Sequence, residues 1–336
     1  MQSASATSWD FGSDWYGDHV DQTAVNQLLD EGLRRLTGTA SRAAAWLALL
    51  PDYQSGQRVA IKVNLNNCLS DGCAGNAIDA LIEPVNALIG GLLERGVAAS
   101  DIWVYDVTHA WHDGRMPPRF VSGCDYPGVH FVAYVGQANP FSSTQFIHYN
   151  PPSGGPALSD QPLCNVLVNA QYLINMPIVK SHPFTGVSLG FKNHFGSFDR
   201  CDYAHIYTPG CPSEIYACYY TANYSPLIDI YSNPHIRDKT ILTVGDCLFG
   251  AWSDPTWTPL PWTTFGNGAP NSLFVARDPV AIECVMTDIL AAETTLLAHT
   301  NDYLYLAGQA GLGVYERGNP WASSYQLIDY QRVLLP

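Results

Sequence analysis

The sequence predicts an α/β protein whose sheet is mainly parallel and is covered by helices on both faces. Two observations lead to this fold class. Short apolar strands alternate with amphipathic helices along most of the chain. Residues 58–105 also form a strand–helix–strand unit, whose length suits a right-handed parallel crossover.

The N-terminal elements of this pattern are two helices and the crossover. One helix is expected from Asp21 to Gly38, and a second from residue 41 to 50, where Pro51 ends it. The crossover has strands at 58–63 and 101–105 and a helix whose apolar face runs from residue 78 to 93. Residues 1–20 have no such period and are interpreted as an N-terminal arm that lies on the body.

The remaining elements are assigned by the same criteria. The apolar run 165–179 is interpreted as a helical turn followed by a strand, and Asp278-Pro279 as a helix start. Residues 21–336 are therefore expected to form one domain, with a Cys/Tyr-rich insertion at about 197–235. The other expected elements are strands at 129–134, 145–149, 240–244 and 325–335, and helices at 279–297 and 302–309.

Composition excludes several classes of protein. The 336 residues include 16 Lys plus Arg and 30 Asp plus Glu, for a net charge of -14. Such a chain lacks the basic surface that nucleic acids and anionic membranes require. No apolar run approaches the ~20 residues that cross a bilayer. The expected partner is a small anionic molecule, and an oligomer is possible.

The nine cysteines indicate a compartment. Cys68 and Cys73 flank a short loop, and Cys201, Cys211 and Cys218 lie in the insertion, where disulfides of an exported protein are the favoured interpretation. The expected location is extracytoplasmic (periplasmic or secreted), although the sequence shows no signal peptide. The alternative is a cytosolic protein with buried thiols, the interpretation that suits the apolar surroundings of three further cysteines, Cys164, Cys247 and Cys284.

Residues 173–196 are the most informative stretch for function. They begin as an apolar strand and end as a polar loop that holds Lys180, His182, Lys192 and His194. Because cations are scarce in this chain, their concentration here indicates a site that recognises an anion or binds a metal. Thr185-Gly186 permits a turn, and residues 187–195 are expected to form a short helix whose N-terminal amides could hold the anion.

Polar side chains also follow the other predicted strands. Ligands of parallel α/β sheets bind beyond the carboxyl ends of the strands. Side chains from four strand ends are therefore expected to gather in one site. They are Lys62, Asn64, Asn66 and Asn67 after the first strand, Asp106, Thr108, His109 and His112 after the second, Lys180 and His182 after the third, and Asp246 after the fourth.

A divalent metal is an alternative occupant of this site. His109 and His112 are three residues apart and Asp113 follows them, so a helix here would place potential ligands together. His194 and His205 could add further ligands. No four-cysteine run suits an iron–sulfur cluster, and none of the usual nucleotide-binding or nucleophile-elbow motifs is present.

Four segments resemble the domain-of-unknown-function family 362. They are Val59-Ala-Ile-Lys-Val-Asn64, Asn175-Met-Pro-Ile-Val-Lys180-Ser-His182, Thr185-Gly186 through Lys192-Asn193-His-Phe-Gly196, and Arg277-Asp-Pro-Val-Ala-Ile-Glu283. The resemblance covers roughly residues 55–315 and brings no established reaction. It implies hallmark positions at Lys62, Asn64, Asp106, Lys180, His182, Lys192, Asn193, Asp246 and Asp278. Glu283 stands where the family more often has Asp.

The combined hypothesis is an enzyme that acts on a small carboxylate or phosphate. His182 would be the general acid/base, Lys180 would polarise the anion, and Asp106 and Asp246 would orient the histidine or hold a metal. Two alternatives stay open: a non-catalytic metal- or anion-binding protein, and a structural component of an extracellular complex. The residues expected to bind the substrate are Lys62, Asn64, Lys192, Asn193 and Thr185.

Overall fold

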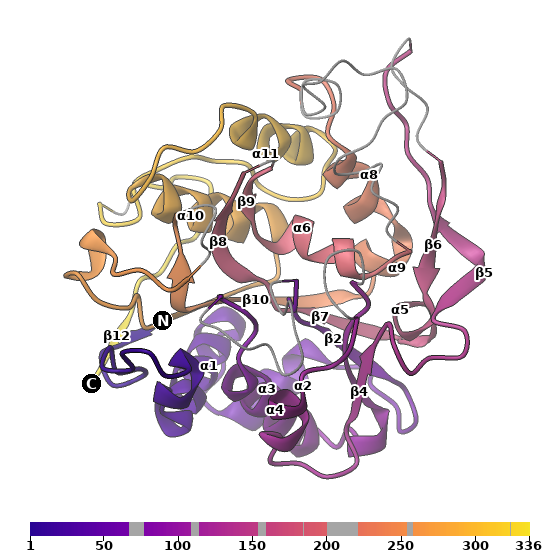
Figure 1. Cartoon of the computed structure of the whole chain (residues 1–336), viewed down its shortest axis with the longest axis horizontal. Coiled ribbons are helices and arrows are strands. Elements are labelled where there is room, and N and C mark those ends of the chain that lie inside the picture. Colours follow the sequence, from indigo (N-terminus) through magenta and orange to yellow (C-terminus); the bar gives the residue numbers. More distant parts are fainter. Residues whose placement is uncertain are drawn as a thin grey trace.

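The structure is a computed structural model that describes residues 1–66, 77–108, 114–153, 159–183, 185–199, 221–253, 258–322 and 324–336. At its centre lies a ten-stranded sheet in the order β12-β1-β11-β10-β7-β2-β3-β4, with β8 paired to β10 and β9 to β8 (Figure 1). These strands are β1 (Gln2–Ser3), β2 (Val59–Lys62), β3 (Ile102–Asp106), β4 (His130–Ala133), β7 (Tyr172–Asn175), β8 (Ile178–His182), β9 (Gly186–Ser188), β10 (Thr240–Ala251), β11 (Ser272–Ala276) and β12 (Leu334–Leu335).

The sheet is mixed but mostly parallel, which confirms the predicted fold class. Strand β2 pairs in parallel with β3 and β7, β3 with β4, and β10 with β7 and β8. The antiparallel pairs are β10 with β11, β1 with β11 and β8 with β9. A separate antiparallel pair joins β5 (Phe141–Ile147) to β6 (Gln161–Cys164).

Helices cover both faces of the sheet (Figure 1). On one face, α1 (Gln22–Thr37), α2 (Arg42–Leu49) and α3 (Ile82–Glu94) enclose a core that contains Leu28, Trp46 and Leu88. On the other face, a second core contains Tyr231, Ile289 and Leu304. Its helices are α6 (Gly190–Asn193), α8 (Pro226–Ser232), α10 (Pro279–Ala291) and α11 (His299–Gln309).

Capping residues explain where the two clearest helices begin and end. The Asp21 carboxylate accepts a hydrogen bond from the Ala24 amide at 2.8 Å, and Gly38 ends α1 in the left-handed conformation at φ 65°. Asp278 caps α10 through the amides of Val280 and Ala281. The remaining short elements are η1 (Tyr16–His19), η2 (Ala99–Asp101), α4 (Pro118–Ser122), α5 (Asn165–Asn169), η3 (His194–Gly196), α9 (Pro234–Arg237) and η5 (Thr263–Phe265).

Several predicted boundaries were wrong. The helix expected from residue 78 begins at Ile82, and Pro84 near its start is the signal for this, since proline suits the first turn. The helix from Asp278 ends at Ala291 rather than 297. The terminal strand is only Leu334–Leu335, whereas the strand from Thr240 continues to Ala251. The prediction also missed β11, and in place of a helix over 187–195 the chain has the end of β9 followed by α6 and η3.

Part of the predicted insertion belongs to the body of the fold. Residues 226–237 form α8 and α9, and they bury Leu227, Ile230 and Ile236 in the second core. Residues 200–220, with Cys201, Cys211 and Cys218, lie outside the described residues, and so do Cys68 and Cys73. The predicted disulfides are thus untested. Cys164, Cys247 and Cys284 are buried free thiols. No helix in the described part of the chain combines the length and apolarity that crossing a bilayer demands.

The chain reverses its direction of growth across the sheet beside β2. From β2 the crossover through α3 leads to β3 on one side, whereas β7, later in the chain, pairs with the opposite edge of β2. Such a reversal opens a crevice beyond the carboxyl ends of the two diverging strands, where ligands of open α/β sheets commonly bind. In this fold the reversal point lies at the ends of β2 and β7.

Candidate functional site

The last residues of β2 and β7 at this point are Lys62 and Asn175. They are register partners in the sheet, and the Met176 amide donates to the Lys62 carbonyl at 2.8 Å. Helix α6 brings a third residue, Asn193, whose side-chain amide donates to the Lys62 carbonyl and to Asn175 Oδ1. The reversal point of the sheet is therefore closed by a buried polar network from three elements.

The Lys62 ammonium is fully engaged within this network. Its Nζ atom donates to the Val63 carbonyl at 2.5 Å and to Asn193 Oδ1 at 3.2 Å, and it lies 3.3 Å from Asp106 Oδ2. Three acceptors match the three N–H groups of an ammonium. Burial lowers the pKa of Lys62, although Asp106 opposes that shift. Lys62 was predicted to bind the substrate directly. Because its ammonium already has three acceptors, we expect it to attract an anionic substrate by its positive charge without a hydrogen bond of its own.

Asp106 is the counter-ion of Lys62. Its carboxylate accepts hydrogen bonds from the Leu65 amide at 2.8 Å and from the amide and hydroxyl of Thr108 at 2.9 and 2.7 Å. Burial would raise the pKa of Asp106, but Lys62 and these hydrogen bonds outweigh it and hold the pKa below its ordinary value. Asp106 thus stays anionic and holds the loops after β2 and β3, rather than acting as a base.

The N-terminal amides of α6 are occupied by the chain itself. Gly190 and Phe191 donate their amide N–H groups to the Glu283 carboxylate, and Tyr303 donates its hydroxyl to the same group at 2.8 Å. The prediction that these amides hold an external anion was wrong, because the Glu283 carboxyl group from α10 already accepts both N–H groups. Burial raises the pKa of Glu283 to about 8. Through its hydrogen bonds to Gly190 and Phe191, Glu283 fixes the helix that carries Lys192 and Asn193 and leads into η3.

Asp79 is a site residue that the sequence analysis missed. It is buried, and neither of its carboxylate oxygens accepts a hydrogen bond from the described residues. Burial raises its pKa to about 8, against the opposing charges of Arg119 and Lys180, while the Asp106 carboxylate raises it further. Arg119 lies 3.7 Å away. A buried carboxyl whose pKa lies near neutrality is a candidate for proton transfer.

Two further carboxyls accompany Asp79. The strand that contains Asp246 was predicted to end at Val244, but β10 continues through Asp246 to Ala251. Asp246 pairs with Ile178 at the beginning of β8, so it still lies at the rim where β7 ends. Burial raises the pKa of Asp246 to about 6 and that of Glu83 to about 7, the latter with a contribution from the Asp246 charge. Asp246 and Glu83 are therefore, like Asp79, buried carboxyls whose pKa values lie near neutrality.

Lys180 and His182 enter the site from the β8–β9 hairpin. Both are buried, Lys180 opposite Ser188 and His182 opposite Gly186, which adopts φ 79° at the turn. The Thr185 amide donates to His182 Nδ1 at 3.4 Å, so a neutral His182 carries its proton on Nε2. The Thr185 hydroxyl donates to the Val187 carbonyl at 2.7 Å, within the turn of the hairpin.

The other predicted residues have distinct positions. Lys192 is buried with Nζ 4.6 Å from the Phe195 ring centroid, and Asn64 Oδ1 accepts the Asn66 amide at 3.1 Å.

His194 is buried beside Ser197 and has its pKa lowered well below the ordinary value by burial, with Lys62 adding to the effect. His109, His112 and His205 lie outside the described residues. Within the described ranges no three His, Cys, Asp or Glu residues cluster as metal ligands.

Four of the residues that complete the site gave little signal in the sequence. Asp79 was read as part of the α3 helix, whereas it lies in the segment before it, where the Tyr16 hydroxyl binds both its amide and its carbonyl. Arg119 lies on α4, which no periodic pattern marks. Glu283 stood out only as a departure from the family pattern, and Tyr16 came from a segment interpreted as an arm.

Comparison with known proteins places the chain in a family. A family model described as Domain of unknown function (DUF362) matches residues 59–288. The chain belongs to this family. The DUF362 match runs from β2 into α10 and includes Lys62, Asp106, Lys180, Asp246 and Glu283.

Two further comparisons add little about activity. The curated proteins contain no match. Among solved structures, the chain is similar to the lactate racemase apoprotein from Thermoanaerobacterium thermosaccharolyticum, with 13% sequence identity and a TM-score of 0.43. The similarity covers 81% of this chain and 56% of that one, so the chain spans little more than half the length of that protein.

Proposed function

We propose that the chain is an enzyme that binds a small carboxylate or phosphate at the reversal point of the sheet and transfers a proton to or from it. One observation carries the proposal. The sequence has four lysines, and three of them, Lys62, Lys180 and Lys192, are only 1%, 1% and 6% exposed. Lysine is almost never buried unless it is paired or functional. Concentrating buried cations in an acidic chain favours an anionic ligand.

The proposed roles follow from the contacts. Lys180 and Lys192 would bind the anion, because both are buried cations, one on β8 and the other on α6, the helix that also brings Asn193 to Lys62. His182 would exchange a proton through Nε2, and Asp79 or Asp246 would be its acidic counterpart. Groups whose pKa values lie near the working pH are the effective acids and bases. Burial provides this for both carboxyls, whose pKa values are about 8 and about 6.

A matched pair of lysine variants tests the binding part. Lys180→Met keeps most of the side-chain volume and removes the charge. Lys239→Met is the control. Lys239 directly precedes β10, its carbonyl accepts the Leu173 amide at the opposite end of the strands, and its ammonium donates to the carbonyls of Leu167 and Val168. A panel of 2-hydroxy and 2-oxo carboxylates and phosphate monoesters would be titrated calorimetrically. We expect Lys180→Met to weaken binding at least tenfold and Lys239→Met to leave it unchanged.

The catalytic part needs a readout of its own. Each panel member that binds would be incubated in D2O. Deuterium entry would be followed by NMR at C2 of the 2-hydroxy carboxylates, at C3 of the 2-oxo carboxylates and at the carbon that carries the phosphate ester. His182→Gln should retain binding and lose exchange by about 10²-fold or more, the usual contribution of a general acid/base. Binding without exchange in the unaltered protein would show a non-catalytic anion-binding protein. If no member of the panel binds, the proposed site is wrong.

A further inference from the structure

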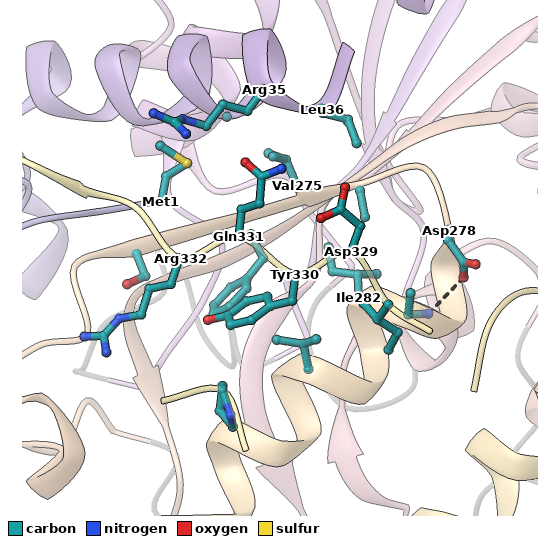
Figure 2. Close-up of a pocket in the computed structure, with 18 of the residues that line it drawn as sticks. Met1, Arg35, Leu36, Val275, Asp278, Ile282, Asp329, Tyr330, Gln331 and Arg332 are labelled. Atoms are coloured by element: carbon teal, nitrogen blue, oxygen red, sulfur yellow. Dashed lines mark hydrogen bonds between the residues drawn. The ribbon is translucent and has the colours of Figure 1, made fainter. Parts of the chain in front are cut away.

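A cavity of about 400 Å³ lies at the β11 edge of the sheet (Figure 2). Its walls come from α1, β11, α10 and the C-terminal segment, and none of the residues assigned to the candidate site lines it. Strand β1 pairs with β11 at Ser272 and is two residues long. Residues 274–276 pair with β10 on one edge, and on the opposite edge they face a space between α1 and α10 instead of another strand.

The C-terminal segment 326–332 closes this space and is held at both ends. At one end the Glu316 carboxylate accepts the amides of Gln326, Leu327 and Ile328 at 2.6, 2.8 and 2.9 Å. At the other end β12 pairs in parallel with β1. Between these anchors the segment contributes Asp329, Tyr330, Gln331 and Arg332 to the lining. The cavity is thus a built feature of the fold, with a fixed outer wall.

The lining combines an apolar interior with a charged rim. Ile282, Val285 and Ile289 of α10 present aliphatic side chains, and Phe265, Phe274 and Trp321 add aromatic ones. A volume of this size and an apolar lining with few polar groups are typical of small-molecule sites. The interior therefore suits an alkyl or aryl group rather than a solvated polar ligand.

Charged side chains of both signs line the cavity: Arg35, Arg277 and Arg332 are cationic, and Asp278 and Asp329 are anionic. Figure 2 shows Arg35 and Arg332 on the same side of the cavity, with Met1 between them, and Asp278 on the other side. Asp278 is committed to the amides of Val280, Ala281 and Val314. Arg332 donates to a neutral acceptor, Gln2 Oε1, at 3.1 Å. Arg35 binds Glu31 within its own helix. An anionic head group would therefore be attracted to the end where Arg332 lies.

We propose that this cavity is a second ligand site, which takes a small amphipathic anion: an alkyl or aryl carboxylate whose apolar body packs against α10 and β11 and whose carboxylate pairs with Arg332. The proposal is independent of the proposed function, because the two sites share no residue. The charge of the head group and the length of the apolar body are the two features that the site would recognise.

Two probes with the same alkyl chain and different head groups test the first of these features. The full chain would be titrated calorimetrically with octanoate and with 1-octanol. We expect octanoate to bind once per chain and octanol at least tenfold more weakly. Arg332→Gln should weaken octanoate binding at least fivefold and leave octanol unchanged. Arg237→Gln is the matched control, because Arg237 is an exposed arginine of α9 that pairs with Asp238, and it should change neither.

A cavity-filling variant tests the location. Ala276 lines the cavity from β11, and Ala276→Phe should abolish binding of both probes while circular dichroism shows an unchanged fold. Lys180→Met should bind octanoate normally, which separates this site from the candidate active site. Equal affinity for octanoate and octanol, or undiminished octanoate binding by a folded Ala276→Phe, would overturn the proposal. Should Ala276→Phe not fold, the Arg332→Gln comparison still decides.

Discussion

The ammonium of Lys62 lies 3.3 Å from the carboxylate of Asp106, and both side chains are almost completely removed from water. Removing one partner of a buried ion pair leaves the other charge buried without compensation, which costs about 3–5 kcal/mol. We expect Lys62→Met and Asp106→Leu each to lower the free energy of unfolding by roughly this amount, and the double variant to lose less than the sum. Urea denaturation measures all three.

The exposed pair Arg237–Asp238 is the control for this experiment. Its atoms approach more closely, to 2.6 Å, but both side chains are about half exposed. Because water screens exposed pairs, Arg237→Gln should leave the free energy of unfolding unchanged within error. Additive losses in the Lys62 and Asp106 double variant would contradict a coupled buried pair.

Gly196 is required by the close approach of η3 to Asp106. A Cβ atom on Gly196 would lie 2.0 Å from Asp106 Oδ1 and 2.7 Å from the Thr108 hydroxyl. We expect Gly196→Ala to cost about 1–3 kcal/mol, the usual cost of overpacking, and to weaken anion binding at the site. In Gly268→Ala the nearest atom would be 3.9 Å away, so this variant should be stable within about 0.5 kcal/mol. Equal stability of the two variants in thermal unfolding would refute the steric argument.

The buried carboxyl of Asp79 makes stability depend on pH. Burial raises its pKa to about 8 from an ordinary value near 4. Between these values the folded chain keeps the proton and the unfolded chain has lost it, so the stability that Asp79 confers at low pH is lost as the pH rises through about 8. One proton changes the free energy of unfolding by at most about 1.4 kcal/mol per pH unit.

The variant Asp79→Asn isolates this effect from other titrating groups. These include His194, whose folded pKa is lowered, and Lys239, with a pKa lowered to about 8 by burial. Because they are common to both proteins, the difference in free energy of unfolding removes them. We expect Asp79→Asn to gain stability relative to the unaltered protein as the pH is raised from 6 to 8. A constant difference over this range would show an ionised Asp79.

Asp278 is predicted to be structural, although the family resemblance marks it as a hallmark position. It caps α10 through two amides and also accepts the Val314 amide at 2.8 Å. Replacing an N-cap by alanine costs about 0.5–2 kcal/mol. The loss of stability in Asp278→Ala should lie at the upper end of this range. Asp21→Ala removes a single hydrogen bond, from the Ala24 amide of α1, and should cost less. Loss of anion binding by a folded Asp278→Ala would assign it a functional role instead.

Much of the fold could be predicted because its signals are local. The crossover from β2 to β3, the turn and strand after residue 165, and the capped starts of α1 and α10 all follow from periodicity and from capping residues. The five-residue strand β11 was missed, although Phe274 and Val275 are residue types enriched in strands. Residues 226–237 were assigned to an insertion because their composition resembles the neighbouring loop, whereas their apolar side chains fill the second core.

By itself, the order of apolar and polar segments determined the α/β architecture, and the polar residues after each strand indicated which rim carries the site. The tertiary structure alone decided how those residues are used, since their partners are far apart in the chain: Asn193 reaches Lys62 across 131 positions, and Glu283 reaches Gly190 across 93. Whether a lysine is saturated by protein acceptors or available to a ligand depends on such contacts and on burial. Neither can be read from residue type or spacing.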